Sequence, residues 1–162
     1  MGILVGGDLV MSDKLGVGVM LQMFCSEGTK STKAITHAKG QKIIAVELRK
    51  QDGEEGPGPS ADQIRIRLGD ATTLVLWDGG QSCCEHRYMN TDDDLQEIVG
   101  GELKDIFIAD GPTEREDGEH GDFLETQFLK IQTTKGEITV ANYNSHNGYY
   151  GGFYLKAKLE FV

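Results

Sequence analysis

Two short segments concentrate the side chains that could do chemistry. The first runs from Trp77 to Tyr88 and holds two thiols, two carboxylates, an imidazole and a guanidinium within twelve residues. Alternate residues of a β-strand point to one face, so Cys84, His86 and Tyr88 would share a face if this segment is extended. A thiol beside an imidazole can be a nucleophile, because a neighbouring positive charge lowers its pKa. Cys84 and His86 are therefore the candidate catalytic pair if the protein is an enzyme.

A structural interpretation of the same segment is simpler, because free cysteines are common in protein cores. A zinc site would need two further ligands at short spacing. The remaining candidates, Cys25, His37, His120 and His146, are scattered along the chain. We therefore predict no metal and no cofactor.

The second segment runs from Asn142 to Tyr154. Its Asn147-Gly148 pair favours a hairpin turn, because both residues tolerate positive φ. The segment could also be a ligand platform, since tyrosine rings offer flat faces to a base or sugar and amides offer oriented hydrogen bonds. The candidate ligand-binding residues of the two segments are Gln81, Ser82, Cys83, Cys84, Glu85, Arg87, Tyr88, Asn144, His146, Asn147, Tyr149 and Tyr150.

Several common catalytic and phosphate-binding motifs are absent from the sequence. Neither GxxxxGK[ST] nor GxGxxG occurs, which argues against a kinase or a dinucleotide enzyme. Neither GxSxG nor HExxH occurs, which argues against a serine hydrolase of that type and a zinc protease.

The charge of the chain restricts its partners. Its net charge of −10 argues against duplex nucleic acid or an anionic membrane, because phosphate contacts need Lys and Arg. Thirteen acidic residues lie between Asp92 and Glu125, against Lys104 and Arg115 only. Such a block is usually a solvated surface, although it could also bind a basic partner or a cation. An EF-hand is excluded, because Arg115 and Gly121 stand where that loop needs Gly and Glu.

The cysteine count and the hydropathy indicate the compartment. Three cysteines, two of them adjacent, do not make a disulfide framework. The first residues lack the basic region of a signal peptide, and no apolar run is long enough to span a membrane. We expect a protein of a reducing cytoplasm with no membrane contact. The sequence leaves the oligomeric state open.

Hydrophobic alternation then indicates the elements that must position these residues. Ile44, Val46 and Leu48 alternate in the first predicted strand. Residues 91–100 predict one short helix, capped by Thr91 with Asp94 in its first turn. Residues 26–40 are polar and predict a linker. The predicted strands cover 42–49, 64–68, 72–77, 103–109, 123–133, 137–143 and 153–162, and the predicted loops include 51–60 and 110–122.

These elements predict an α+β fold, β-rich and single-domain, with a mostly antiparallel sheet of about six strands and one short helix. Residues 1–40 would be an N-terminal extension whose structure the sequence leaves open. Residues 41–162 would be the β-rich domain.

The two segments also carry a recognisable signature. The runs DGGQSCCE (78–85), RYM (87–89), TDDDL (91–95) and HNGYYGGF (146–153) resemble a family of small uncharacterised proteins common in bacteriophages and prophages. The resemblance covers about residues 41–162. It implies a phage origin and action inside a bacterial cell, with no established activity and no catalytic residues to transfer. It also suggests that the two segments act together.

Three functions follow as hypotheses. The first is a non-enzymatic phage accessory protein that binds a host component, in its specific form by sequestering a nucleotide-like signal of host defence. The second is a cysteine-dependent enzyme that uses Cys84 and His86. The third is an acidic module whose residues 92–125 block a basic surface of a host protein.

Overall fold

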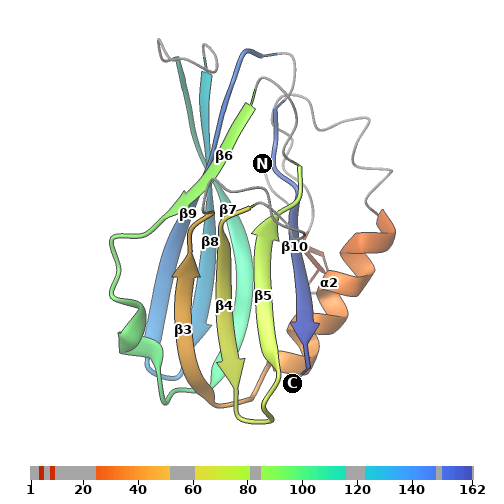
Figure 1. Ribbon diagram of the computed structural model, residues 1–162, viewed down its shortest axis with the longest axis vertical. Coiled ribbons are helices and arrows are strands. Elements are labelled where there is room, and N and C mark those ends of the chain that lie inside the picture. Colours follow the sequence, from red (N-terminus) through yellow and green to blue (C-terminus); the bar gives the residue numbers. More distant parts are fainter. Residues whose placement is uncertain are drawn as a thin grey trace.

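The computed structural model describes residues 4–5, 8–9, 25–51, 61–80, 85–115, 123–148 and 151–161. They form two four-stranded antiparallel sheets that face each other, with one α-helix at the side (Figure 1). A short antiparallel pair, β1 (Leu4–Val5) and β2 (Asp8–Leu9), lies apart from these sheets. No helix among the described residues is long and apolar enough to cross a membrane.

The two sheets are named here by their strands. The front sheet has the order β10-β5-β4-β3 and the back sheet the order β6-β9-β8-β7. The front sheet consists of β3 (Ile43–Arg49), β4 (Gln63–Leu68), β5 (Thr73–Asp78) and β10 (Leu155–Glu160). The back sheet consists of β6 (Glu85–Asn90), β7 (Leu103–Arg115), β8 (Phe123–Thr133) and β9 (Gly136–His146).

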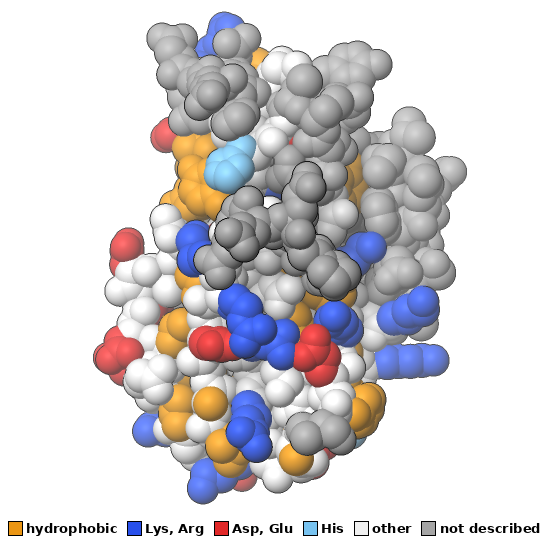
Figure 2. Space-filling view, in the orientation of Figure 1, with side chains coloured by type: hydrophobic (Ala, Val, Ile, Leu, Met, Phe, Trp, Pro, Cys, Tyr) orange, Lys and Arg blue, Asp and Glu red, His pale blue; other side chains and the backbone are white. Residues whose placement is uncertain are grey.

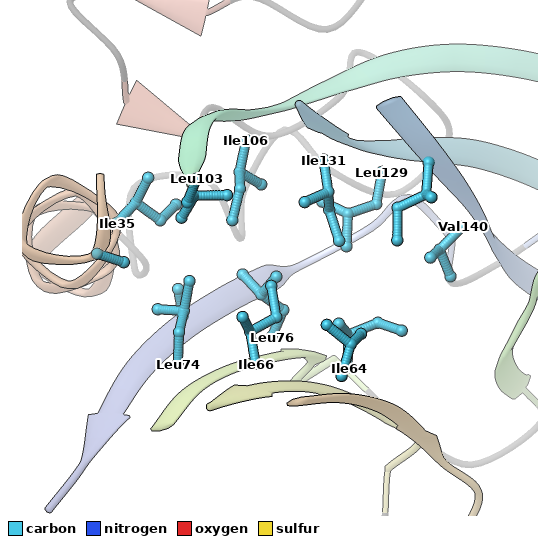
Figure 3. Close-up of a cluster of buried hydrophobic side chains, with 14 of the residues drawn as sticks. Ile35, Ile64, Ile66, Leu74, Leu76, Leu103, Ile106, Leu129, Ile131 and Val140 are labelled. Carbon is cyan, nitrogen blue, oxygen red and sulfur yellow. The ribbon is translucent and has the colours of Figure 1, made fainter. Parts of the chain in front are cut away.

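The hydrophobic core lies between the two sheets. Because side chains alternate along a strand, each sheet turns one apolar face towards the other. Figure 3 shows this packing, with side chains of β4 and β5 below those of β7, β8 and β9. The facing residues include Ile64, Ile66, Leu74 and Leu76 on one side and Ile106, Leu129, Ile131 and Val140 on the other.

The prediction of a β-rich antiparallel fold is confirmed, but the strand count is wrong. The eight strands of the sandwich divide into two sheets, where about six strands in one sheet were expected. A single sheet would leave one of its faces without cover. The second sheet gives the apolar residues of both sheets a common interior.

The prediction of a linker over residues 26–40 is wrong. This segment forms helix α2 (Cys25–Ala38), which lies along β10 (Figure 1). Among the helix residues whose burial the structure describes, the buried stripe consists of Ser31, Ala34, Ile35 and Ala38. Two alanines and one isoleucine among polar residues give a weak periodic signal. Packing against β10 is what stabilises this helix, and the sequence does not show that contact.

The predicted helix over 91–100 is shorter than expected. It is one 3₁₀ turn, η1 (Leu95–Ile98), capped by Asp94, whose side chain accepts a hydrogen bond from the Gln96 N–H. The Thr91 hydroxyl donates instead to the Thr139 carbonyl at 2.7 Å. Thr91 Oγ1 also accepts the Asp93 N–H at 3.1 Å, so Thr91 begins a turn ahead of η1 and the cap lies three residues later than predicted.

Two register shifts change the predicted strand patterns. In β3 a shift between Ile43 and Ala45 turns Ile44 outwards, and Ile44 is 44% exposed. In β7 a shift between Asp110 and Thr113 lets the strand continue to Arg115, into the predicted loop. Such bulges add a residue to one strand, and hydrophobic alternation alone does not reveal them.

Candidate functional site

Strands β6 and β9 bring the two chemistry-bearing segments together. They pair antiparallel, with Glu85 opposite His146, Arg87 opposite Asn144 and Tyr88 opposite Tyr143. The two segments are therefore neighbours in space, although Glu85 and Asn144, which share a hydrogen bond, are 59 residues apart in the sequence.

Strand alternation divides the predicted site residues between two faces of the back sheet. Glu85, Arg87, Asn144 and His146 are buried inside the sandwich. Tyr88 is half-buried on the outer face, where His86 is exposed. His86 and His146 consequently lie on opposite faces, and one site could not use both.

The other predicted residues have different outcomes. Asn147 is exposed in the turn after β9, where Gly148 has a positive φ of 89°. The predicted hairpin turn at Asn147-Gly148 is wrong, because the chain passes from β9 in the back sheet to β10 in the front sheet. Six predicted residues lie outside the described part of the chain: Gln81, Ser82, Cys83, Cys84, Tyr149 and Tyr150. The Cys84–His86 pair is therefore not placed by the structure.

Arg87 is the centre of the buried cluster. Its guanidinium donates to Asp78 at 2.9 and 3.0 Å, to Glu85 at 2.8 and 3.2 Å, and to the Gly152 carbonyl at 2.9 Å. Burial by itself would lower the pKa of Arg87, but the charges and hydrogen bonds of Asp78 and Glu85 outweigh it and raise the pKa. An anionic ligand would have to compete with two carboxylates for this guanidinium.

His146 and Glu125 form a second buried pair. The His146 Nδ1 accepts a hydrogen bond from the Gly148 N–H at 2.9 Å, so the proton of the neutral ring lies on Nε2. Nε2 is 2.6 Å from Glu125 Oε1, although Oε1 lies off the direction of the N–H bond. Oε1 also accepts the Gly152 N–H at 2.9 Å.

Sequence reasoning missed Glu125, Gln127 and Asn142, which also face this cluster. A signal for them exists in the sequence, because the inner face of the β8–β9 hairpin changes from apolar to polar at one level. Leu129 pairs with Val140, the next inner pair is Gln127 with Asn142, and the one after it is Glu125 with Asn144. The short turn between Thr133 and Gly136 fixes this register.

The outer face of the back sheet carries a row of stacked rings. The ring centroids of His86 and Tyr88 are 5.1 Å apart, and those of Tyr88 and Tyr143 are 4.9 Å apart. A groove of about 280 Å³ opens beside Tyr143. It is lined by Asn90, Thr91, Asp92, Asp93, Phe128, Thr139, Ala141 and Tyr143.

Two lysines flank this groove and its rings. Lys50 Nζ is 5.9 Å from the centroid of the Tyr88 ring. Lys130 Nζ is 5.9 Å from the centroid of Phe128 and donates to Thr139 Oγ1 at 2.9 Å. Both lysines already have acidic partners, since Lys50 Nζ is 2.8 Å from Asp62 Oδ2 and Lys130 Nζ is 3.6 Å from Glu137 Oε1.

A family model described as "Domain of unknown function (DUF7448)" matches residues 25–156. The chain belongs to this family. The matched range begins at α2, earlier than the resemblance over 41–162, and it includes both the buried cluster and the outer groove. No curated protein and no solved structure matches the chain.

The described residues of the acidic segment, 92–115 and 123–125, do not form one surface. Glu125 is fully buried, and Asp105 pairs with Lys39 at 3.0 Å. Asp93 accepts the Thr139 N–H at 2.7 Å, and Asp94 caps η1. In the described ranges, no three His, Cys, Asp or Glu side chains group so that they could hold a metal ion.

Proposed function

We propose that the protein is a non-enzymatic ligand-binding protein and that its ligand binds in the outer groove beside Tyr143. The observation that carries this proposal is the stacked row of His86, Tyr88 and Tyr143 next to that groove. These rings stand on paired strands, so little ordering is needed when a flat ligand binds.

The chemistry of the groove supports a nucleotide-like ligand. An aromatic ring that stacks on a base contributes about 1–3 kcal/mol. The carboxylates of Asp92 and Asp93 can accept hydrogen bonds from sugar hydroxyls or from the amino group of a base. Lys130, at the Phe128 side, already lies 3.6 Å from Glu137 and donates to Thr139, so it adds little attraction for a phosphate.

The charge of the whole chain limits how such a ligand would be captured. A protein of net charge −10 repels anions at a distance. Binding would then depend on stacking at short range, and the affinity for a nucleoside would be close to that for the corresponding nucleotide.

The biological setting belongs to the same proposal. The resemblance of the signature to phage and prophage proteins supports a phage origin, and the cytoplasm of an infected bacterium is the compartment where the protein would act. Sequestration of a nucleotide-like defence signal needs binding only, so it requires no catalytic residues.

Calorimetric titration of the full chain with cyclic and NAD-derived nucleotides, and with the matching nucleosides, tests this function. We expect binding that Tyr143→Ala weakens roughly tenfold or more through loss of the stacking contact. Phe161→Ala is the matched control, because Phe161 is a 74% exposed aromatic residue just after β10.

Flat titration traces for every compound would contradict the proposal, as would equal binding by the Tyr143→Ala variant. Chromatography of the ligand after long incubation separates binding from catalysis. Recovery of the unchanged compound is expected, and a product would favour the enzyme hypothesis.

A further inference from the structure

The strongest unexplained feature of the molecule lies inside the sandwich. The inner faces of β8 and β9 carry two adjacent cross-strand pairs, Glu125 with Asn144 and Gln127 with Asn142. We name these four residues the amide–carboxylate quartet. Each is at most 1% exposed. The quartet is separate from the outer groove, because the intervening Tyr143 points to the opposite face.

Five polar atoms of the quartet have no hydrogen-bond partner among the described residues. They are Glu125 Oε2, both side-chain amide atoms of Gln127, Asn142 Oδ1 and Asn144 Oδ1. A buried polar atom that has lost its water and gained no partner costs free energy, so native proteins rarely contain several together. Five such atoms on two neighbouring pairs are groups that a bound ion or buried waters would satisfy.

The free atoms specify the chemistry of such an ion. Four of the five are oxygens that only accept, and one of them belongs to a carboxylate. Arg87 already binds Asp78 and Glu85, and no Lys or Arg among the described residues pairs with Glu125, which has His146 Nε2 at 2.6 Å. A cation would therefore balance the carboxylate of Glu125.

The surrounding hydrogen bonds orient these oxygens. Asn142 Nδ2 donates to Asp78 at 3.1 Å and Asn144 Nδ2 donates to the Gly152 carbonyl at 3.1 Å, so each Oδ1 is the end of the amide left free. The Gly152 N–H occupies Glu125 Oε1 and leaves Oε2. Partners of this kind hold metal ligands in position in known sites.

We propose that the amide–carboxylate quartet binds a hard divalent cation of the Ca²⁺ class. Ca²⁺ accepts carboxylate and amide oxygens in a flexible geometry, whereas Mg²⁺ demands a near-ideal octahedron and retains its waters. The quartet contains no thiol or imidazole for a softer metal. Because the described part of the chain offers no group of three or more His, Cys, Asp or Glu ligands, the amide oxygens are essential to this site.

The test uses the full chain after treatment with a chelator. Ca²⁺ is titrated by calorimetry, native mass spectra count the bound ions, and thermal melts record the Tm. We expect one Ca²⁺ per chain, a Tm that rises with Ca²⁺ concentration, and a weaker response to Mg²⁺.

Two variants of the quartet and one control make the test specific. Glu125→Gln removes the charge and retains the shape, and Gln127→Met removes both free amide atoms without a change of charge. Each should weaken Ca²⁺ binding roughly tenfold or more. Without Ca²⁺, Gln127→Met should melt at or above the Tm of the unchanged chain, since it removes two unpartnered polar atoms. Glu102→Gln, an exposed acid just before β7, should leave Ca²⁺ binding unchanged.

Absence of any Ca²⁺ response in calorimetry and melting overturns the proposal, and buried waters would then satisfy the quartet. An equal response by Gln127→Met and the unchanged chain overturns it too. If Glu125→Gln fails to fold, Gln127→Met still decides the outcome. Tyr143→Ala should retain the Ca²⁺ response, so failure of this inference and failure of the outer-groove function remain distinguishable.

Discussion

At the scale of single residues, Asp62 connects the two sheets. It directly precedes β4 of the front sheet and is 7% exposed. Its carboxylate accepts hydrogen bonds at 2.8 Å from Lys50 Nζ, from the Gln51 N–H and from the Met89 N–H in β6 of the back sheet. The Asp62 carboxylate thus links β4 to β6, two strands that belong to different sheets and do not pair with each other.

The pKa of Asp62 gives a prediction with a definite sign. Burial by itself would raise this pKa, but the three hydrogen bonds and the charge of Lys50 outweigh it and lower the pKa below its usual 3.8. A carboxyl with a lower pKa in the folded state stabilises the fold above its unfolded pKa and loses that contribution as the pH falls through the folded value. We expect Asp62→Asn to reduce the free energy of unfolding by about 2 kcal/mol at neutral pH.

Urea denaturation at neutral pH and at about pH 3 checks this expectation, since the difference between the two proteins should shrink as the carboxyl becomes protonated. Asp92→Asn is the control, because Asp92 is exposed. A loss of the same size at both pH values would show that the contribution of Asp62 is not electrostatic.

At the scale of elements, α2 protects the edge strand β10. An edge strand presents unpaired backbone groups that can recruit another chain. The Ser31 hydroxyl of α2 accepts a hydrogen bond from the Ala157 N–H at 2.9 Å, and Ile35 is 1% exposed. The helix thus satisfies part of the β10 backbone and extends the core sideways.

Ile35→Ala measures how much the docking of α2 contributes. We expect the free energy of unfolding to fall by about 2–4 kcal/mol, because a large aliphatic side chain leaves a cavity between helix and sheet. Ile44→Ala is a matched control, since Ile44 is 44% exposed beside the bulge of β3 and should lose roughly 0.5 kcal/mol or less. Equal losses in urea denaturation would show that α2 is not docked as described.

At the scale of the whole molecule, the outer face of the front sheet carries paired charges of both signs. The outer face of the front sheet alternates cations and anions across its strands, and Figure 2 shows them side by side. Arg65 lies between Glu47, at 3.6 Å, and Glu160. The hydrogen bond from Arg65 lowers the pKa of Glu160. Exposed pairs of this kind stabilise a fold little, so this face contributes mainly solubility.

One continuous hydrophobic core joins the helix and both sheets. Ala34, Ile35 and Ala38 belong to the same buried cluster as the strands, although the sequence suggested a division at residue 40. We expect a single unfolding transition, in which far-UV circular dichroism and the fluorescence of Trp77 on β5 coincide. A separate early transition of the helical signal would instead support an independent N-terminal extension.

The sequence alone determined the elements whose signals are local. The strand predicted over 123–133 has the bounds of β8, because alternation and the following turn lie within the same few residues. The Asn-Gly pair likewise indicated a turn with positive φ at Gly148, but not that this turn leads from one sheet to the other. The Arg87, His146, Glu85 and Asn144 side chains stood out by type, whereas Glu125 beside His146 did not.

Only the tertiary structure decided which of these residues share a site. Alternation placed Tyr88 and Arg87 on opposite faces, but the interior that buries Arg87 exists only once the front sheet covers it. Glu125 resembled one acid among thirteen until the pairing of β8 with β9 set it opposite Asn144. The physical reason is that strand periods are encoded by neighbours in the chain, whereas burial and hydrogen-bond partners come from residues far apart in it.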